Sequence, residues 1–198
     1  MKIQADTIGF TTVVLLFASW FLFALIFLLR KRPATRAKET KRAPAARFGL
    51  ALQSLAYALI WIFQRPQWWP FSPSAIGESI LAALVILLAW AGSGWCLWAA
   101  RALGKQWTLE ARVIEGHDLI TQGPYGIVRN PIYLGMFGLL LATGLAMTRP
   151  EALLGGVALF LIGNRIRIRA EERLLRESFG AEFDDYARRV PAFLPRIL

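Results

Sequence analysis

Cysteine and histidine are almost absent from this sequence, which has only Cys96 and His117 among its 198 residues. A single cysteine excludes a disulfide framework and a cysteine-based metal cluster within one chain. A single histidine excludes a metal site built on paired histidines, so we predict no bound metal. Cys96 lies within a long apolar run. We interpret it as a small, buried apolar residue.

Charged residues are also scarce. They make up 18% of the chain, whereas 56% of the residues are hydrophobic; soluble domains carry about 25% charged residues. This composition excludes an ordinary soluble domain and indicates an integral membrane protein. No recognisable nucleic-acid-binding module accompanies the net charge of +10, so we predict no nucleic acid partner. The positive residues cluster beside apolar runs, which is typical of membrane topology and of contact with anionic membrane lipids.

Long apolar segments predict an all-α membrane protein with about five transmembrane helices and a cytosolic C-terminal helical extension. A helix of about 20 apolar residues crosses a bilayer core of about 30 Å. The first segment precedes the cluster Arg30-Lys31-Arg32, and we interpret it as a retained anchor rather than a cleaved signal. The fifth is apolar only to about Gly163, so it is expected to tilt or to continue as a helix into the polar tract. The five segments are approximately residues 9–29, 48–63, 75–100, 132–148 and 152–163.

Lysine and arginine are distributed unequally between the two sides of these spans. Residues 30–47, 101–130 and 164–198 hold eight, four and eight of them, and only three fall on the opposite side. The positive-inside rule therefore predicts an external N-terminus and a cytosolic C-terminus. The richness in Ala, Leu and Arg and the short loops favour a prokaryotic inner membrane. We divide the chain into residues 1–100, with three spans and the basic cytosolic loop 30–47, and residues 101–198, which carry the candidate site.

Small residues recur at helical spacing in the last three spans and predict close packing between helices. They are Gly92, Ser93 and Gly94 in the third, Gly135, Gly138 and Ala142 in the fourth, and Gly155 and Gly156 in the fifth.

Two polar blocks stand at the predicted cytosolic ends of the spans. In the first, residues 123–125 (Gly-Pro-Tyr) precede residues 129–133 (Arg-Asn-Pro-Ile-Tyr). Asn130 suits an N-cap and Pro131 the first helical position, so the fourth span is expected to begin with free N–H groups that favour an anion. An ordinary capped helix is the alternative. The second block covers residues 165–195. Because both blocks fall on the same side, we expect them to build one site.

The second block has helical character from Arg165 to Gly180. Arg167 and Glu171 are four residues apart and should share a face. Glu171 and Glu172 are candidates to bind ribose hydroxyls or a substrate amine. A solvated ladder of ion pairs with snorkelling arginines is the alternative.

These residues together resemble the isoprenylcysteine carboxyl methyltransferase family of integral membrane enzymes, which shares a C-terminal signature with phospholipid N-methyltransferases. The resemblance covers about residues 103–198. It rests on the order and spacing of Leu103-Gly104, Glu115-Gly116-His117-Asp118-Leu119-Ile120, Gly123-Pro124-Tyr125, Arg129-Asn130-Pro131-Ile132-Tyr133, Glu171-Glu172, residues 179–186 (Phe-Gly-Ala-Glu-Phe-Asp-Asp-Tyr) and Arg189-Val190-Pro191.

The resemblance implies S-adenosylmethionine as cofactor, held between the loop before the fourth span and the polar continuation of the fifth. It implies that Arg167 faces the substrate and that the cofactor contacts Glu110, His117, Asp118, Leu119, Ile120, Tyr125, Asn130, Pro131, Ile132, Tyr133 and Glu171. The family's usual Arg-His-Pro reads Arg129-Asn130-Pro131 here. Asparagine can cap a helix or bind a cofactor, but it cannot act as an acid or base near neutral pH.

The resemblance implies transfer of a methyl group to the carboxylate of a prenylcysteine-like substrate that enters from the bilayer. Such a carboxylate is a nucleophile without losing a proton, so catalysis would consist mainly of placement. A phospholipid amine, a small thiol or another lipid-like acid stays open as acceptor, as does the oligomeric state. A non-catalytic scaffold or a transporter is the alternative class, although the spans carry almost none of the ionisable residues that transport favours.

Overall fold

A computed structural model describes residues 2–29, 39–42, 45–65, 75–104, 112–114 and 118–194. In these ranges the chain is almost entirely helical, which confirms the all-α prediction. The long helices are α1 (Lys2–Leu29), α2 (Ala45–Ile62), α3 (Ala75–Leu103), α4 (Pro131–Met147) and α5 (Pro150–Phe179). Shorter elements are β1 (Glu39–Arg42), β2 (Arg112–Ile114), the 3₁₀ turn η2 (Gly123–Gly126) and α6 (Ala181–Arg189).

All five predicted apolar segments are helical, but within the described ranges only three helices are long and apolar enough to cross a membrane. These are α1, α2 and α3. Helix α4 has 17 residues, or about 26 Å at 1.5 Å per residue, slightly less than a hydrocarbon core of about 30 Å. Helix α5 runs without a break from its apolar half into the polar tract, as expected, and ends at Phe179.

Large apolar side chains cover the outer faces of the helices. In water they would make a continuous apolar surface, whereas in a bilayer they face lipid. The chain is therefore an integral membrane protein, and the predicted orientation of its termini remains a prediction. The exposed side chains include Phe10, Phe21 and Leu28 on α1, Phe48 and Ile62 on α2, Ile76, Ile80 and Leu87 on α3, and Leu154 and Ile162 on α5.

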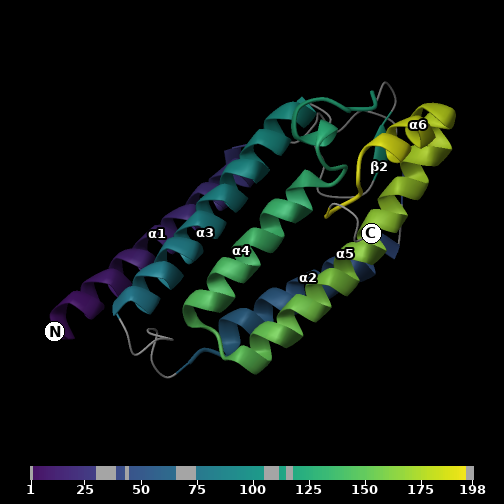
Figure 1. Cartoon of the computed structure of the whole chain (residues 1–198). Helices are drawn as coiled ribbons and strands as arrows, with labels where there is room; N and C mark the ends of the chain where they lie inside the picture. The colour runs from purple at the N-terminus through teal and green to yellow at the C-terminus, as the bar shows by residue number, and fades with distance from the viewer. Residues whose placement is uncertain are drawn as a thin grey trace.

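Helix α4 lies in the middle of the bundle. The pairs α2 with α5, α3 with α4, and α1 with α3 make the main contacts, and α4 also touches α1, α2 and α5. Strand β2, η2 and α6 gather at one end of the bundle (Figure 1). The predicted cytosolic blocks therefore meet at this end, which we call the site end.

A short antiparallel pairing of β1 with β2 joins two loops. The sequence of the basic loop 30–47 predicts only a role in orientation and lipid contact. The pairing adds a structural role, because it ties residues 39–42 of this loop to the segment that precedes η2.

Two helix pairs owe their close contact to glycine. A Cβ added at Gly92 of α3 would lie 2.6 Å from the carbonyl oxygen of Gly135 on α4. A Cβ added at Gly49 of α2 would lie 2.6 Å from the carbonyl oxygen of Gly163 on α5. The predicted packing role is thus confirmed for Gly92 and Gly135, but it is wrong for Gly94, whose added Cβ would meet nothing within 4 Å.

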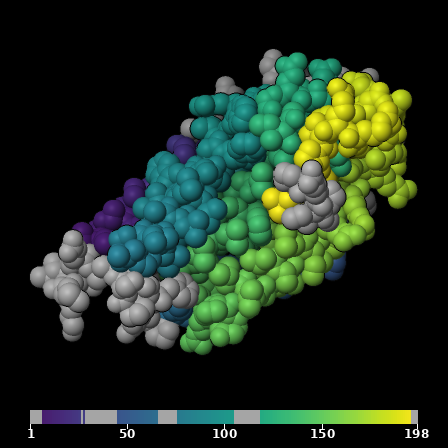
Figure 2. Space-filling view, in the orientation of Figure 1, coloured from purple at the N-terminus to yellow at the C-terminus, as the bar shows by residue number. Residues whose placement is uncertain are grey.

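Gly180 ends α5 and turns the chain into α6. Its φ of 54° is in the left-handed region that favours glycine. In the space-filling view, α6 and the segment after it lie against the η2 region and the end of α5 (Figure 2). This turn brings the C-terminal segment back over the start of α4.

Candidate functional site

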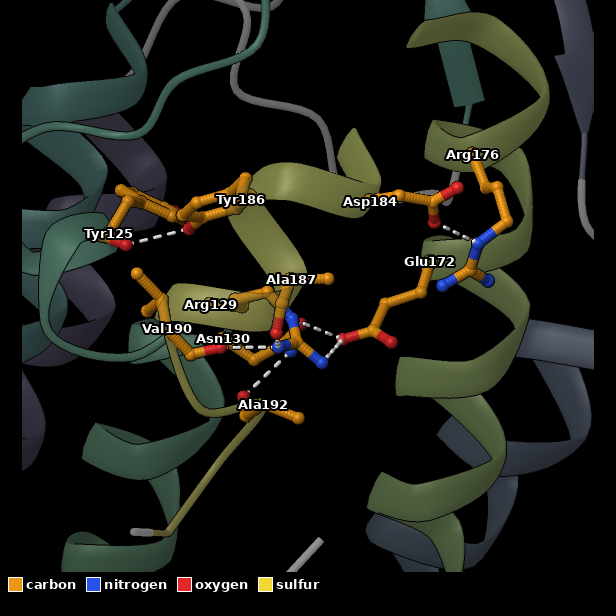
Figure 3. A network of polar contacts seen from close by, with 10 residues as sticks. All are labelled: Tyr125, Arg129, Asn130, Glu172, Arg176, Asp184, Tyr186, Ala187, Val190 and Ala192. Carbon is orange, nitrogen blue, oxygen red and sulfur yellow. Dashed lines mark hydrogen bonds and ion pairs between the residues drawn. The ribbon is translucent and has the colours of Figure 1, made fainter. Parts of the chain in front are cut away.

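Arg129 joins the two polar blocks at the site end. Its guanidinium pairs with the Glu172 carboxylate of α5, at 2.8 Å from both Nε and Nη2 to Oε1. Nη1 donates to the carbonyl oxygens of Ala187 and Val190 (Figure 3). The backbone N–H of Arg129 donates to the carbonyl oxygen of Pro191. The half-buried guanidinium therefore fixes α5, α6 and the start of α4 relative to one another.

Asn130 occupies the position before α4, as predicted, but its side chain does not cap the helix. Instead, Nδ2 donates to the carbonyl oxygen of Ala192 at 2.9 Å, and the backbone N–H donates to the same oxygen at 3.1 Å. The capping prediction is therefore wrong, because the returning C-terminal segment engages the amide. The helix still begins with N–H groups that have no intrahelical partner and with the positive end of its dipole.

Tyr133, Arg167 and Glu171 come together beside this helix start. The Tyr133 hydroxyl donates to Oε1 of Glu171, and Nη2 of Arg167 lies 3.4 Å from the same oxygen. The Arg167 guanidinium carbon also lies 5.0 Å from the centre of the Tyr133 ring, within the range of a cation–π contact. The shared face predicted for Arg167 and Glu171 is confirmed, and Tyr133 joins it from α4.

Burial raises the pKa of Glu171, and the neighbouring Glu172 raises it further. The charge of Arg167 and the hydrogen bonds from Tyr133 and Arg167 act in the opposite direction but do not cancel the effect of burial. The carboxylate charge is thus costly at this position, and a ligand that donates hydrogen bonds to it would be favoured.

Two buried amides continue the polar contacts from Arg167 along the α2–α5 pair. Nη1 of Arg167 lies 3.4 Å from Oε1 of Gln53 on α2, and Nε2 of Gln53 lies 3.5 Å from Oδ1 of Asn164 on α5. The exposed fraction is 1% for Gln53 and 0% for Asn164. Neither residue was predicted from the sequence. The available signal was a lone polar residue within or directly after an apolar run, which marks functional positions in membrane helices.

The Gly49–Gly163 contact lies directly against Arg167. A Cβ on Gly49 would come within 2.6 Å of Cγ of Arg167 as well as of the Gly163 carbonyl oxygen. Glycine at position 49 therefore provides the space in which the stem of Arg167 lies.

The remaining predicted cofactor contacts lie around η2. Tyr125 is buried within η2, and its carbonyl oxygen accepts a hydrogen bond of 2.6 Å from the Tyr186 hydroxyl of α6. Burial raises the pKa of Tyr186, so this hydroxyl keeps its proton. Asp118 is exposed, and Leu119 and Ile120 are half-buried ahead of η2. Glu110 and His117 lie outside the described residues. The cofactor roles of all these residues stay predictions.

Pro131 and Ile132 form the start of α4, and the Ile132 carbonyl oxygen accepts a contact of 3.4 Å from the Cys96 sulfur on α3. The Glu172 carboxylate pairs with Arg129, so it acts on the Tyr133–Arg167–Glu171 cluster through its charge. Within the described ranges, no group of three His, Cys, Asp or Glu side chains is placed to hold a metal ion.

The sequence pattern of the phospholipid methyltransferase family matches residues 80–182. The matched range contains all of α4 and α5, with Tyr133, Arg167 and Glu171. It does not contain α2, which supplies Gln53 and Gly49.

Relatives with several different names match the chain. Methanethiol S-methyltransferase 2 of Bradyrhizobium diazoefficiens is 30% identical over 89% of this chain and 70% of its own length. Nickel-cobalt-cadmium resistance protein NccN of Alcaligenes xylosoxydans xylosoxydans is 41% identical over 48% of this chain and 45% of its own. Protein-S-isoprenylcysteine O-methyltransferase B of Arabidopsis thaliana is 32% identical over 46% and 48%. In the last two cases the match spans about half of the relative or less.

Proposed function

Because the chain belongs to the phospholipid methyltransferase family of membrane proteins, we propose that it transfers a methyl group from S-adenosylmethionine to a lipid-like acceptor. The observation that carries this proposal is the Arg167–Glu171 pair beside Tyr133 at the start of α4. A ladder of exposed ion pairs would not bury its charged side chains, whereas a site that binds a charged cofactor and an acceptor would.

The polar groups at the site end fit this cofactor. When bound, S-adenosylmethionine supplies a methyl group on a positively charged sulfur, which leaves as a neutral thioether once the methyl is transferred. Glu171 and the Tyr133 hydroxyl would accept hydrogen bonds from the ribose or the amino group. The first N–H groups of α4 would bind the cofactor's carboxylate, since a helix N-terminus favours an anion.

Arg167 would orient the acceptor. We favour the carboxylate of a prenylcysteine-like molecule, because guanidinium groups bind carboxylates in a defined geometry. The opposite charges of Arg167 and Glu171 cancel. The positive sulfur of the cofactor would then favour an acceptor with one negative charge. A carboxylate needs no base before it reacts, which agrees with an asparagine at position 130. Holding the reacting atoms together without water would provide most of the acceleration.

A small thiol is the second candidate acceptor. The relative named methanethiol S-methyltransferase 2 is similar across 89% of this chain, so its match extends into the N-terminal helices that the family pattern leaves out. A thiol would need to lose a proton, and Glu171, which pairs with Arg167 and whose pKa is raised by burial, would accept it.

The proposal is tested with purified protein in lipid nanodiscs and S-adenosylmethionine labelled in its methyl group. The acceptors are N-acetyl-S-farnesylcysteine, its carboxamide and ethanethiol. We expect label on the acid and none on the carboxamide. We also expect loss of label in Arg167→Ala but not in Arg173→Ala, since the Arg173 side chain is 83% exposed on the same helix. Label on the thiol alone would favour the second candidate, and no label on any acceptor would contradict the proposal.

A further inference from the structure

Asn164 has a hydrogen-bond donor that the described part of the protein leaves unmatched. The side chain is completely buried between α5 and α2, and its Oδ1 accepts the contact from Gln53. Its Nδ2 has no partner among the residues that the structure describes. A buried amide donor without an acceptor is unfavourable, and each such group in a native protein calls for an explanation.

The position of Asn164 suggests the explanation. Asn164 precedes Arg167 by three residues on α5, so the two lie on one helix face. Both contact Gln53, Arg167 through Nη1 at 3.4 Å and Asn164 through Oδ1 at 3.5 Å. Helix α5 runs from its apolar half toward the site end, which places Asn164 one turn further from that end than Arg167.

We propose that Asn164 is a second donor for the acceptor, binding one of its oxygens through Nδ2 while Arg167 binds the other. Gln53 is a positioning residue in this arrangement, because its Oε1 accepts from Arg167 and its Nε2 donates to Asn164. This inference rests on the proposed methyltransferase function and adds the residues that select among acceptors.

Two donors on one helix face match the two oxygens of a carboxylate. A thiol offers a single sulfur, which is a weak hydrogen-bond acceptor, so it would leave one of these buried donors unmatched. Sites that present buried polar groups discriminate strongly against ligands that leave them unpaired. The Asn164 donor, positioned by Gln53, would therefore select an oxygen acceptor. Gln53 comes from α2, outside the family pattern at residues 80–182.

The test compares Asn164→Leu and Asn164→Asp with the wild type, using N-acetyl-S-farnesylcysteine and ethanethiol as acceptors. Asn164→Leu removes the donor, and we expect the KM for the acid to rise about tenfold, as for the loss of one hydrogen bond to a charged group. Asn164→Asp places a second carboxylate against the acceptor, so the KM should rise further and partly recover at lower pH. In both variants kcat and the affinity for S-adenosylhomocysteine should stay within about twofold, and the KM for the thiol should not rise.

Gln53→Leu tests the positioning role. Removing the contact to Arg167 should raise the KM for the acid severalfold, with kcat and S-adenosylhomocysteine affinity unchanged. Ser93→Ala is the matched control: it also removes a buried polar contact between helices, from Ser93 of α3 to the Ser19 carbonyl oxygen of α1 at 2.9 Å, but on the other side of the bundle. The control should keep every kinetic constant.

The outcomes separate this inference from the function on which it rests. If wild-type protein fails to bind S-adenosylhomocysteine in titration calorimetry, the proposed function and this inference fall together. If the wild type binds it and methylates the acid, while the Asn164 variants keep the wild-type KM, only the inference is overturned. The inference is also overturned if these variants lose cofactor affinity as strongly as acceptor affinity, because that result indicates a general structural role.

Discussion

The α2–α5 and α3–α4 crossings have the same type of glycine contact but differ in the side chains next to it. In each, a glycine faces the carbonyl oxygen of a glycine on the partner helix, and an added Cβ would approach that oxygen to 2.6 Å. Beside the α3–α4 contact lies Cys96, a small buried residue. Beside the α2–α5 contact lies Arg167, with the amides of Gln53 and Asn164 next to it.

This difference separates packing from function. Close helix contact through small residues is a general way to associate helices in lipid, and the α3–α4 crossing needs no other explanation. Buried polar side chains in a membrane protein are costly. Their concentration at one of two otherwise similar crossings is the reason why we propose the α2–α5 pair, with Tyr133 of α4, as the functional one.

The largest expected effect is that of Arg167→Lys. Lysine keeps the positive charge but lacks the planar group that reaches both Gln53 and Glu171. We expect methyl transfer to fall by about 100-fold, the scale expected when reacting groups are misplaced by about 1 Å. Initial rates with labelled S-adenosylmethionine check this. A variant with the wild-type rate would show that charge alone suffices and that the polar geometry is not needed.

Next in size is the contrast between Gly49→Ala and Gly92→Ala. Both should lower stability by about 1–3 kcal/mol, because each Cβ meets a backbone oxygen. Only Gly49→Ala also meets Cγ of Arg167, so only this variant should lose activity, by about tenfold or more. Thermal unfolding in detergent and rate measurements provide both readouts. Equal losses of activity in the two variants would remove the distinction between the crossings.

The pH dependence of stability is expected to be smaller. Because burial raises the pKa of Glu171 in the folded protein, the fold favours the protonated form relative to the unfolded chain. The stability gained this way is complete below the usual glutamate pKa and is lost as pH rises through the raised value. Unfolding curves of wild type and Glu171→Gln should therefore show the wild type losing stability relative to the variant over that interval. The opposite trend would mean that Arg167 and Tyr133 outweigh burial.

Cys96→Ala should have the smallest effect. It removes the sulfur from the α3–α4 crossing without adding volume, so the free energy of unfolding should fall by about 1 kcal/mol. The rate of methyl transfer should stay within twofold. A large loss of activity would place functional groups at this crossing too.

Much of the site followed from local sequence patterns. The four-residue spacing of Arg167 and Glu171 was sufficient to predict their shared face, because helix geometry alone determines it. The polar character of residues 165–179 likewise allowed the continuation of α5 to be predicted. The meeting of the two blocks followed from topology, since both lie at the same ends of the spans.

Contacts that depend on a distant partner could not be predicted in this way. The Asn130 amide binds the Ala192 carbonyl oxygen instead of capping α4, and position 192 is 62 residues away in the chain. Gln53 is 111 residues from Asn164, and only the crossing of α2 with α5 brings them together. Strand β1 forms only because β2 pairs with it; its four residues, Glu-Thr-Lys-Arg, show no hydrophobic alternation of their own.

The most direct test of the central claim is titration calorimetry of the lipid-supplied protein with S-adenosylhomocysteine, in wild type, Glu171→Ala and Glu177→Ala. Glu177 is the matched control, an exposed glutamate on the same helix that pairs with Arg173. We predict micromolar binding in the wild type, the same binding in Glu177→Ala, and a loss of at least about tenfold in Glu171→Ala. No binding by well-folded wild-type protein, or equal binding by all three, would contradict the account.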